Sequence, residues 1–136
     1  MILIRNARVL TMEDDKVIQG GEILMDGGKI VDVGSARSAP GAQVVDARGM
    51  YALPGVVDAH CHIGMFEDGM GFEGDDGNEA TDPLTPQLRA LDAINPMDRC
   101  FSEALSCGVT CAATGPGSAN VIGGQFLAMK TNGHEI

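Results

Sequence analysis

Hydrophobic and polar positions in the first third of the chain alternate over short runs that turn residues separate. Residues 2–11 mix β-branched and polar side chains, and residues 22–25 and 29–33 flank the sequence Asp26-Gly27-Gly28. Because Asp and Gly tolerate the positive φ angles of a tight turn, this stretch predicts a β-hairpin. No helical periodicity interrupts the pattern, which therefore predicts a small all-β module over residues 1–53. We expect its other features to be a turn over residues 13–16, a loop over residues 35–42 and a short strand over residues 44–46.

The pattern changes after Pro54-Gly55. Residues 56–63 alternate with period two, so Asp58, His60 and His62 share one face of a predicted strand, and the opposite face is apolar. A strand with a polar inner face and an apolar outer face is typical of a barrel whose outside is covered by helices. We therefore expect the polar residues to reach the open end of such a barrel.

A long connection without obvious periodicity follows over residues 64–85. Connections of this length are uncommon in compact domains and are usually functional or disordered. Two interpretations stay open for it: a solvated acidic loop, or a lid or substrate loop beside the histidines. Its acidic residues are Glu67, Asp68, Glu73, Asp75, Asp76, Glu79 and Asp82.

The rest of the chain predicts alternating helices and strands. A short helix is expected over residues 87–94, and a second over residues 97–107 after the break at Asn95-Pro96. Residues 109–113 form an apolar run that predicts a buried strand, and residues 125–130 predict a brief helix. This order gives two βα units in series over the second half of the chain.

Charge and composition narrow the classes of function. Nine Lys and Arg against nineteen Asp and Glu give a net charge of −10, which argues against nucleic acids and anionic membrane surfaces as partners. The longest uncharged stretch, residues 104–129, is interrupted by glycines and a proline, so it does not predict a membrane helix. The N-terminus shows no signal-peptide pattern, and we expect a cytoplasmic protein.

The four cysteines show no pattern of a disulfide framework or of a structural zinc site. They are Cys61, Cys100, Cys107 and Cys111, and no pair has the C-x-x-C spacing. In a chain without a secretion signal, cysteines are usually reduced. We expect small, buried thiols.

His60-Cys61-His62 is the candidate for chemistry. Residues i and i+2 of a strand point the same way, so their imidazoles can share one metal ion. Zinc binds neutral imidazole nitrogen but needs about four ligands, so two histidines leave a site incomplete. Asp58, one pleat deeper, could orient a histidine through its second ring nitrogen, or it could anchor a turn or the barrel floor. His134, near the end of the sequence, is expected to be exposed and not to be a third ligand.

Three segments resemble a known family. Residues 53–62, Leu-Pro-Gly-Val-Val-Asp-Ala-His-Cys-His, resemble the first barrel strand of the metal-dependent amidohydrolase superfamily. Residues 27–34 resemble part of the small β-sandwich beside that barrel. Residues 108–125 are similar to the imidazolonepropionase-related branch, which includes cyclic-amide hydrolases and prolidase-like dipeptidases.

The resemblance implies an α/β architecture with a small β module. Residues 1–53 would form part of a composite β-sandwich, and residues 54–136 the first two βα units of a (β/α)8 barrel. One or two divalent metals, most commonly zinc, would activate water for hydrolysis of a C–N bond in a cyclic amide or dipeptide. His60 and His62 would be metal ligands. Asn120 and Gln125 would line the substrate pocket, or alternatively would hydrogen-bond loop backbone.

The chain also departs from the family pattern. A (β/α)8 barrel takes about 250 residues, and the family's other metal ligands and its general-base aspartate have no counterpart here. We therefore expect the chain to be inactive alone and to act as the N-terminal portion or subunit of a hydrolase, with a second polypeptide completing the barrel. The alternatives are a truncated fragment, which would form homo-oligomers, and a non-catalytic β-sandwich assembly module.

Overall fold

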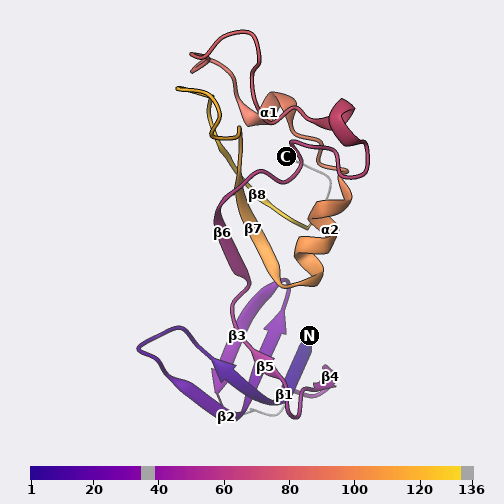
Figure 1. Ribbon diagram of the computed structural model, residues 1–136. Coiled ribbons are helices and arrows are strands. Elements are labelled where there is room, and N and C mark those ends of the chain that lie inside the picture. Colours follow the sequence, from indigo (N-terminus) through magenta and orange to yellow (C-terminus); the bar gives the residue numbers. More distant parts are fainter. Residues whose placement is uncertain (35–38, 133–136) are drawn as a thin grey trace. The chain divides into compact units, whose positions relative to one another are not determined.

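The computed structural model describes residues 1–34 and 39–132, so part of the loop expected over residues 35–42 lies outside the described residues, as does His134. The chain divides into two compact units, Met1–Pro54 and Gly55–Ile136 (Figure 1). Each unit is described by itself. No helix in the described part of the chain is long and apolar enough to cross a membrane.

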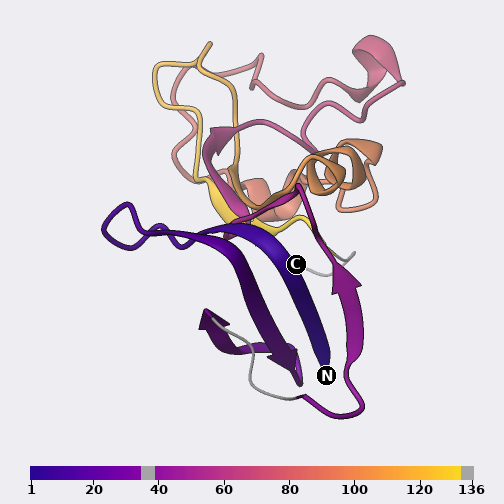
Figure 2. The ribbon, with the colours of Figure 1, turned by 90° about the horizontal axis from the view of Figure 1, so that it is seen from below.

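The first unit is a mixed β-sheet (Figure 2). Its central strand β1 pairs antiparallel with β2, which pairs antiparallel with β3. On its other side β1 pairs in parallel with β4 near its start and with β5 near its end. The strands are β1 (Ile2–Leu10), β2 (Val17–Asp26), β3 (Lys29–Gly34), β4 (Gln43–Asp46) and β5 (Tyr51–Ala52).

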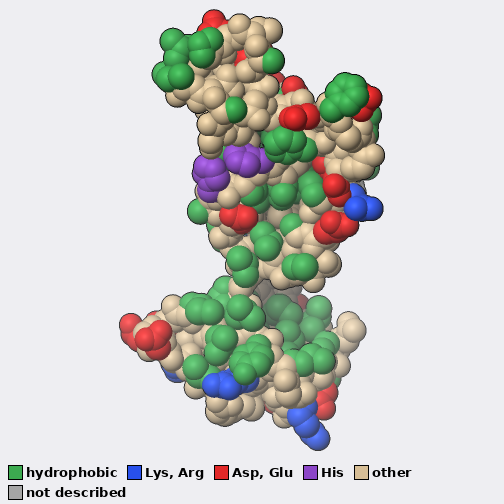
Figure 3. Space-filling view, in the orientation of Figure 1, with side chains coloured by type: hydrophobic (Ala, Val, Ile, Leu, Met, Phe, Trp, Pro, Cys, Tyr) green, Lys and Arg blue, Asp and Glu red, His purple; other side chains and the backbone are tan. Residues whose placement is uncertain are grey.

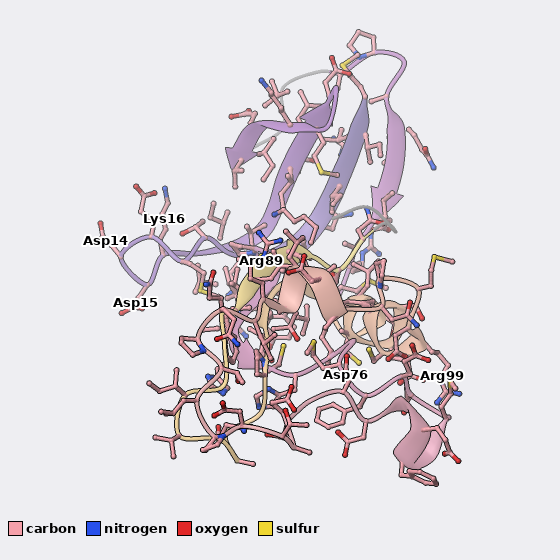
Figure 4. All side chains as sticks on the ribbon, turned by 90° about the horizontal axis from the view of Figure 1, so that it is seen from above. Asp14, Asp15, Lys16, Asp76, Arg89 and Arg99 are labelled. Carbon is pink, nitrogen blue, oxygen red and sulfur yellow. The ribbon has the colours of Figure 1, made fainter. Side chains whose placement is uncertain are left out.

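Local sequence explains the turns of this sheet. Gly27 and Gly28 have φ angles of 54° and 75°, the left-handed values that a two-residue hairpin turn requires, so the hairpin prediction is confirmed. The turn between β1 and β2 carries the exposed, charged side chains of Asp14, Asp15 and Lys16 (Figure 4). Strand β5 was not predicted, because two residues carry no periodicity.

The core of the first unit is small. Ala7, Val9 and Ala47 are buried, and partly buried apolar side chains from β1, β2 and β5 pack against them. Val9 also borders an apolar pocket of about 330 Å³ on this sheet, together with Ile18, Ile23 and Ile30. The sheet therefore keeps an apolar surface that its own residues do not fill.

The second unit is built on a three-stranded sheet with the order β6-β7-β8. Strand β6 (Val56–Cys61) runs parallel to β7 (Val109–Thr114), and β8 (Leu127–Lys130) runs antiparallel to β7. Three short helices lie in the connection between β6 and β7: η1 (Gly71–Gly74), α1 (Ala90–Ala93) and α2 (Arg99–Ser106). Strand β6, helix α2 and strand β7 thus form one β-α-β crossover.

The helix predicted over residues 125–130 is wrong, because Leu127–Lys130 is strand β8. Leu127 pairs with Thr114, and Lys130 pairs with Cys111. A segment this short gains little from helix formation. Pairing with β7, in contrast, gives hydrogen-bond partners to the backbone N–H and C=O groups at the edge of that strand. Burial alternates along the strand, with Met129 buried between exposed neighbours. Over residues 55–132 the second half therefore contains one βα unit and an antiparallel strand, and the predicted second βα unit is not formed within these described residues.

Helix α2 begins at Arg99, two residues later than the predicted start. Asp98 is its N-cap, and the Asp98 carboxylate accepts a hydrogen bond from the backbone N–H of Cys100 at 3.4 Å. The second carboxylate oxygen accepts the backbone N–H of Asp68 at 3.0 Å. One buried aspartate thus joins the start of α2 to the acidic loop.

The core of the second unit draws on the loop after β6, both α-helices and β8. Its buried members are Met65, Ala90, Ile94, Phe101 and Met129. Gly64 has a φ of 81°, and a Cβ atom there would lie 2.7 Å from the Phe101 ring. The backbone two residues after His62 is therefore packed directly on the core.

Phe101 provides a test of this core. The Phe101→Ala substitution is expected to lower the free energy of unfolding by about 3–5 kcal/mol, because it removes a buried ring and leaves a cavity. Urea denaturation followed by circular dichroism measures the change. The matched control is Phe72→Ala, whose ring is 84% exposed, with an expected change within about 0.5 kcal/mol. Similar losses in both variants would contradict this description of the core.

Candidate metal centre

His60 lies near the C-terminal end of β6, and His62 directly follows the last residue of the strand, Cys61. Histidine side chains lie side by side in Figure 3. Their ring centroids are 5.3 Å apart, and the ring planes are nearly perpendicular, at 87°. Two imidazoles bound to one tetrahedral zinc ion have ring centres about 5 Å apart, given Zn–N bonds of about 2.0–2.1 Å. The strand thus brings two nitrogen ligands to a spacing that fits a shared metal ion.

A backbone carbonyl orients His62. The Nδ1 atom of His62 lies 2.7 Å from the carbonyl oxygen of Gly115, the residue after β7. Since a carbonyl can only accept, Nδ1 carries the proton and donates it, which leaves the lone pair of neutral His62 on Nε2. Metal-ligating histidines are commonly held in this way through their second nitrogen.

Asp58 acts on the backbone of the same strand. Between Asp58 and Cys61, β6 advances three residues while β7 advances two, from Ala112 to Thr114, so the pairing is irregular there. The Asp58 carboxylate accepts the backbone N–H of His60 at 3.1 Å. A bulge disrupts ladder hydrogen bonds, and this contact supplies a partner at that point. The hydrogen bond of Asp58 to His60 is therefore to its backbone and not to its imidazole.

Asn120 and Gln125 join two loops. Both N–H groups of the Asn120 amide point to carbonyls, those of Glu79 at 2.8 Å and Asp82 at 3.3 Å. The Gln125 amide donates to the carbonyl of Pro86 at 3.2 Å. Among the described residues, neither amide hydrogen-bonds to an imidazole. The Oδ1 atom of Asn120 is buried and has no hydrogen-bond partner in the part of the chain that the structure describes.

These contacts belong to a longer junction between the loop after β6 and the loop after β7. The backbone N–H of Gly117 donates to the Gly77 carbonyl at 2.6 Å, and the Asn78 side chain accepts the N–H of Ala119 at 3.2 Å. Further along, the Thr85 hydroxyl donates to the Gly123 carbonyl at 2.9 Å. The acidic loop is thus fixed along much of its length to its neighbour.

Phe126 was missed by the sequence analysis. Its ring centroid lies 5.0 Å from that of His60 and 6.1 Å from that of His62. The residue comes 64 positions after His62 in the sequence, and no local pattern connects the two. Phe66 is also near, with its ring centroid 6.5 Å from that of His62.

Further ligands besides the two histidines would be needed for a four-coordinate site. Over residues 1–34 and 39–132, no group of three or more His, Cys, Asp or Glu side chains is arranged to hold a metal ion. Cys100 lines a pocket of about 480 Å³ next to His62. Burial, and secondarily the negative charge of Asp98, raises the pKa of the Cys100 thiol to about 11. Without a metal ion nearby, Cys100 is therefore a neutral thiol at neutral pH.

Sequence comparison finds relatives among hydrolases. No family model matches the chain. Amidohydrolase tasK of Hapsidospora irregularis is 36% identical over 146 aligned positions, covering 94% of this chain. A 5'-deoxyadenosine deaminase of Methanococcoides burtonii is 45% identical over 67 residues, and a dihydroorotase of Streptococcus pyogenes is 44% identical over 63, each covering just under half of this chain. The chain spans 15% of the length of each of these relatives.

Solved structures that are similar to this chain include an amidohydrolase and a prolidase. An amidohydrolase from Thermotoga maritima matches 99% of this chain with a TM-score of 0.89 and 44% identity, and the match covers 35% of that protein. A prolidase in complex with N-methylphosphonate-L-proline matches 82% of this chain and 24% of its own, with a TM-score of 0.53 and 24% identity, which shows the fold alone.

The hydrogen bond to Gly115 predicts the tautomer of His62. In its neutral form His62 is expected to carry its proton on Nδ1, since the carbonyl cannot donate. Long-range ¹H–¹⁵N NMR spectra of the metal-free chain distinguish the two ring nitrogens directly. A proton on Nε2 would contradict the orientation described here, and the His62→Ala variant identifies the signals.

The raised pKa of Cys100 predicts slow alkylation. With a pKa of about 11, only about one thiol in a thousand is ionised at pH 8, so labelling by iodoacetamide should be slow. The rate should increase about tenfold per pH unit up to pH 10, because the thiolate is the nucleophile. Mass spectrometry of labelled peptides measures both, with the exposed Cys107 as the internal comparison. Labelling of Cys100 that is as fast as that of Cys107 at pH 8 would refute the prediction.

Proposed function

Because the chain carries the N-terminal domain region of the amidohydrolase superfamily, we propose that it forms part of a hydrolase of C–N bonds in which His60 and His62 bind a divalent metal. The observation that carries this proposal is the oriented histidine pair, 5.3 Å apart, with Nδ1 of His62 occupied by the Gly115 carbonyl. Zinc is the preferred candidate, because neutral imidazole nitrogens suit it well. One or two ions are compatible with two histidine ligands.

The metal, when bound, would supply an activated water molecule and polarise the substrate carbonyl. His60 and His62 would hold it, His62 through Nε2, and Asp58 keeps the backbone of β6 in place at His60. Asn120 and Gln125 are proposed to border the substrate. Since both N–H groups of Asn120 are engaged with loop carbonyls and its amide oxygen is buried, a substrate contact at that residue would require the two loops to separate.

The architecture proposed for the complete protein is a (β/α)8 barrel beside a composite β-sandwich. The β6-α2-β7 crossover, which is parallel, supports a start of the barrel at residue 54. We propose that residues 1–53 form part of a β-sandwich, which further strands from outside this range complete. The apolar pocket on the first sheet supports this proposal. The rest of the barrel, with the remaining ligands and the general base, is proposed to come from a further polypeptide segment, as a second chain or as additional length. A homo-oligomer is the alternative assembly.

The substrate class follows from the relatives by analogy. Their names describe a deaminase and a dihydroorotase, and we propose a small cyclic amide or a dipeptide for this chain. The finer resemblance to the imidazolonepropionase-related branch stays a prediction. All four cysteines are free thiols, which supports the cytoplasm as the proposed compartment.

The histidine assignment predicts a loss of metal. His60→Ala and His62→Ala should each reduce zinc affinity at least tenfold, because each removes one of the two nitrogen ligands. Isothermal titration with Zn²⁺ measures affinity, and elemental analysis of the purified protein measures occupancy. The His134→Ala variant is the matched control and should bind zinc like the wild type. Unchanged zinc affinity in both His60→Ala and His62→Ala would exclude this pair as the metal site.

The assembly is tested on protein from its own source by native mass spectrometry. A complex with a further chain that contains zinc and hydrolyses cyclic amides or dipeptides supports the proposal. In that complex, His60→Ala and His62→Ala should each abolish turnover. A metal-free homo-oligomer without turnover would instead favour a fragment or a non-catalytic assembly module.

A further inference from the structure

Phe126 packs on both histidines, although nothing in the sequence connects them. Its ring lies at 42° to that of His60, with centroids 5.0 Å apart, and at 62° to that of His62, with centroids 6.1 Å apart. The two imidazoles are themselves in edge-to-face contact. The three rings therefore form one cluster, in which Phe126 limits the space that either imidazole has for rotation.

The register of β7 and β8 explains why Phe126 lies there. Leu127 pairs with Thr114 in an antiparallel ladder. The next position outward on each strand, Phe126 on one and Gly115 on the other, must then be opposite each other. Gly115 is also the residue whose carbonyl holds Nδ1 of His62. Strand pairing thus brings the aromatic ring and the orienting carbonyl to the same point.

Gly115 makes this arrangement possible because it has no side chain. A Cβ atom at Gly115 would lie 2.6 Å from two atoms of the Phe126 ring and 3.0 Å from the Phe126 Cα. The backbone contact means that the strain could not be relieved by rotation of the ring alone. Any larger residue at Gly115 would displace Phe126 from this position.

We infer that Phe126 is a positioning residue for the His60–His62 pair, held in place by the absence of a side chain at Gly115. The ring limits the rotation of both imidazoles and covers one side of the pair, while the Gly115 carbonyl leaves Nε2 of His62 available. It contacts no reacting group and is not a catalytic residue. This inference rests on the proposed metal-binding role of the pair, and the apolar surroundings of a metal site control its solvent access and local dielectric.

The first measurement needs no metal. In the NMR spectrum of the metal-free chain, the ring current of Phe126 should shift the carbon-bound protons of both imidazoles. Phe126→Leu should remove these shifts, and Phe126→Tyr should keep them because it keeps the ring. Gly115→Ala should alter them in the same sense as Phe126→Leu. Imidazole proton shifts that are identical in the wild type and in Phe126→Leu would overturn the inference, whatever the chain binds.

The second measurement is Zn²⁺ affinity by calorimetry. Phe126→Leu and Gly115→Ala should each weaken Zn²⁺ binding about tenfold, the size expected when an orienting partner of a ligand is lost. Phe126→Tyr should bind Zn²⁺ with the affinity of the wild type. Leu127→Ala is the matched control, because it removes a core contact of the adjacent residue and leaves the Phe126 side chain unchanged. Leu127→Ala should lower the free energy of unfolding without a comparable loss of Zn²⁺ affinity.

Two outcomes separate this inference from the proposed function. If the wild type binds Zn²⁺ and Phe126→Leu binds it within a factor of two, the positioning role is wrong and the metal site stands. If the wild type binds no Zn²⁺, the proposed metal site fails for this chain, while the shifts of the imidazole protons still decide whether Phe126 positions the pair.

Discussion

The hydrogen bond between the His62 ring and the Gly115 carbonyl links the ends of two parallel strands at the point where the candidate chemistry lies. It depends on the pairing of β6 with β7, which in turn depends on the α2 crossover and on the core around Phe101. Gly64 connects the two regions, since its backbone packs against Phe101 only two residues after His62. The orientation of one imidazole is therefore a property of the whole second unit.

The two loops that follow these strands are organised by backbone hydrogen bonds more than by charge. The loop after β6 is rich in acidic residues, yet its contacts to the loop after β7 use carbonyls, amides and a threonine hydroxyl. Such contacts between uncharged groups are insensitive to salt. Exposed ion pairs such as Arg99–Asp68 are screened by salt and add little to the stability of the fold. Asn120 and Gln125 are part of this network, and any role toward a substrate would have to coexist with it.

Much of the fold follows from short-range patterns. The hairpin at Gly27-Gly28 rests on turn chemistry, and the His60–His62 pair rests on alternation within a few residues. Strands β1, β4 and β7 rest on short runs rich in β-branched or apolar residues. The segment around Phe126 was predicted as a helix because six residues of mixed polarity fit either period. Asp98 was read as a helical residue, although its side chain caps the helix and holds Asp68. At Phe126 the pairing of β8 with β7 overrides the local preference. At Asp98 the cap on Cys100 is a local contact, and only the hydrogen bond from Asp68 is distant in the sequence.

The sequence by itself determined the two-part organisation of this protein, its resemblance to amidohydrolases and the identity of the two candidate ligands. These properties depend on residue types at fixed local spacings, which strand geometry converts directly into neighbouring side chains. Only the tertiary structure decided which His62 nitrogen is free, that Asp58 holds backbone, and that Phe126 and Gly115 complete the surroundings of the pair. These features depend on the register between β6, β7 and β8, and a register is set by packing between segments that no local pattern encodes.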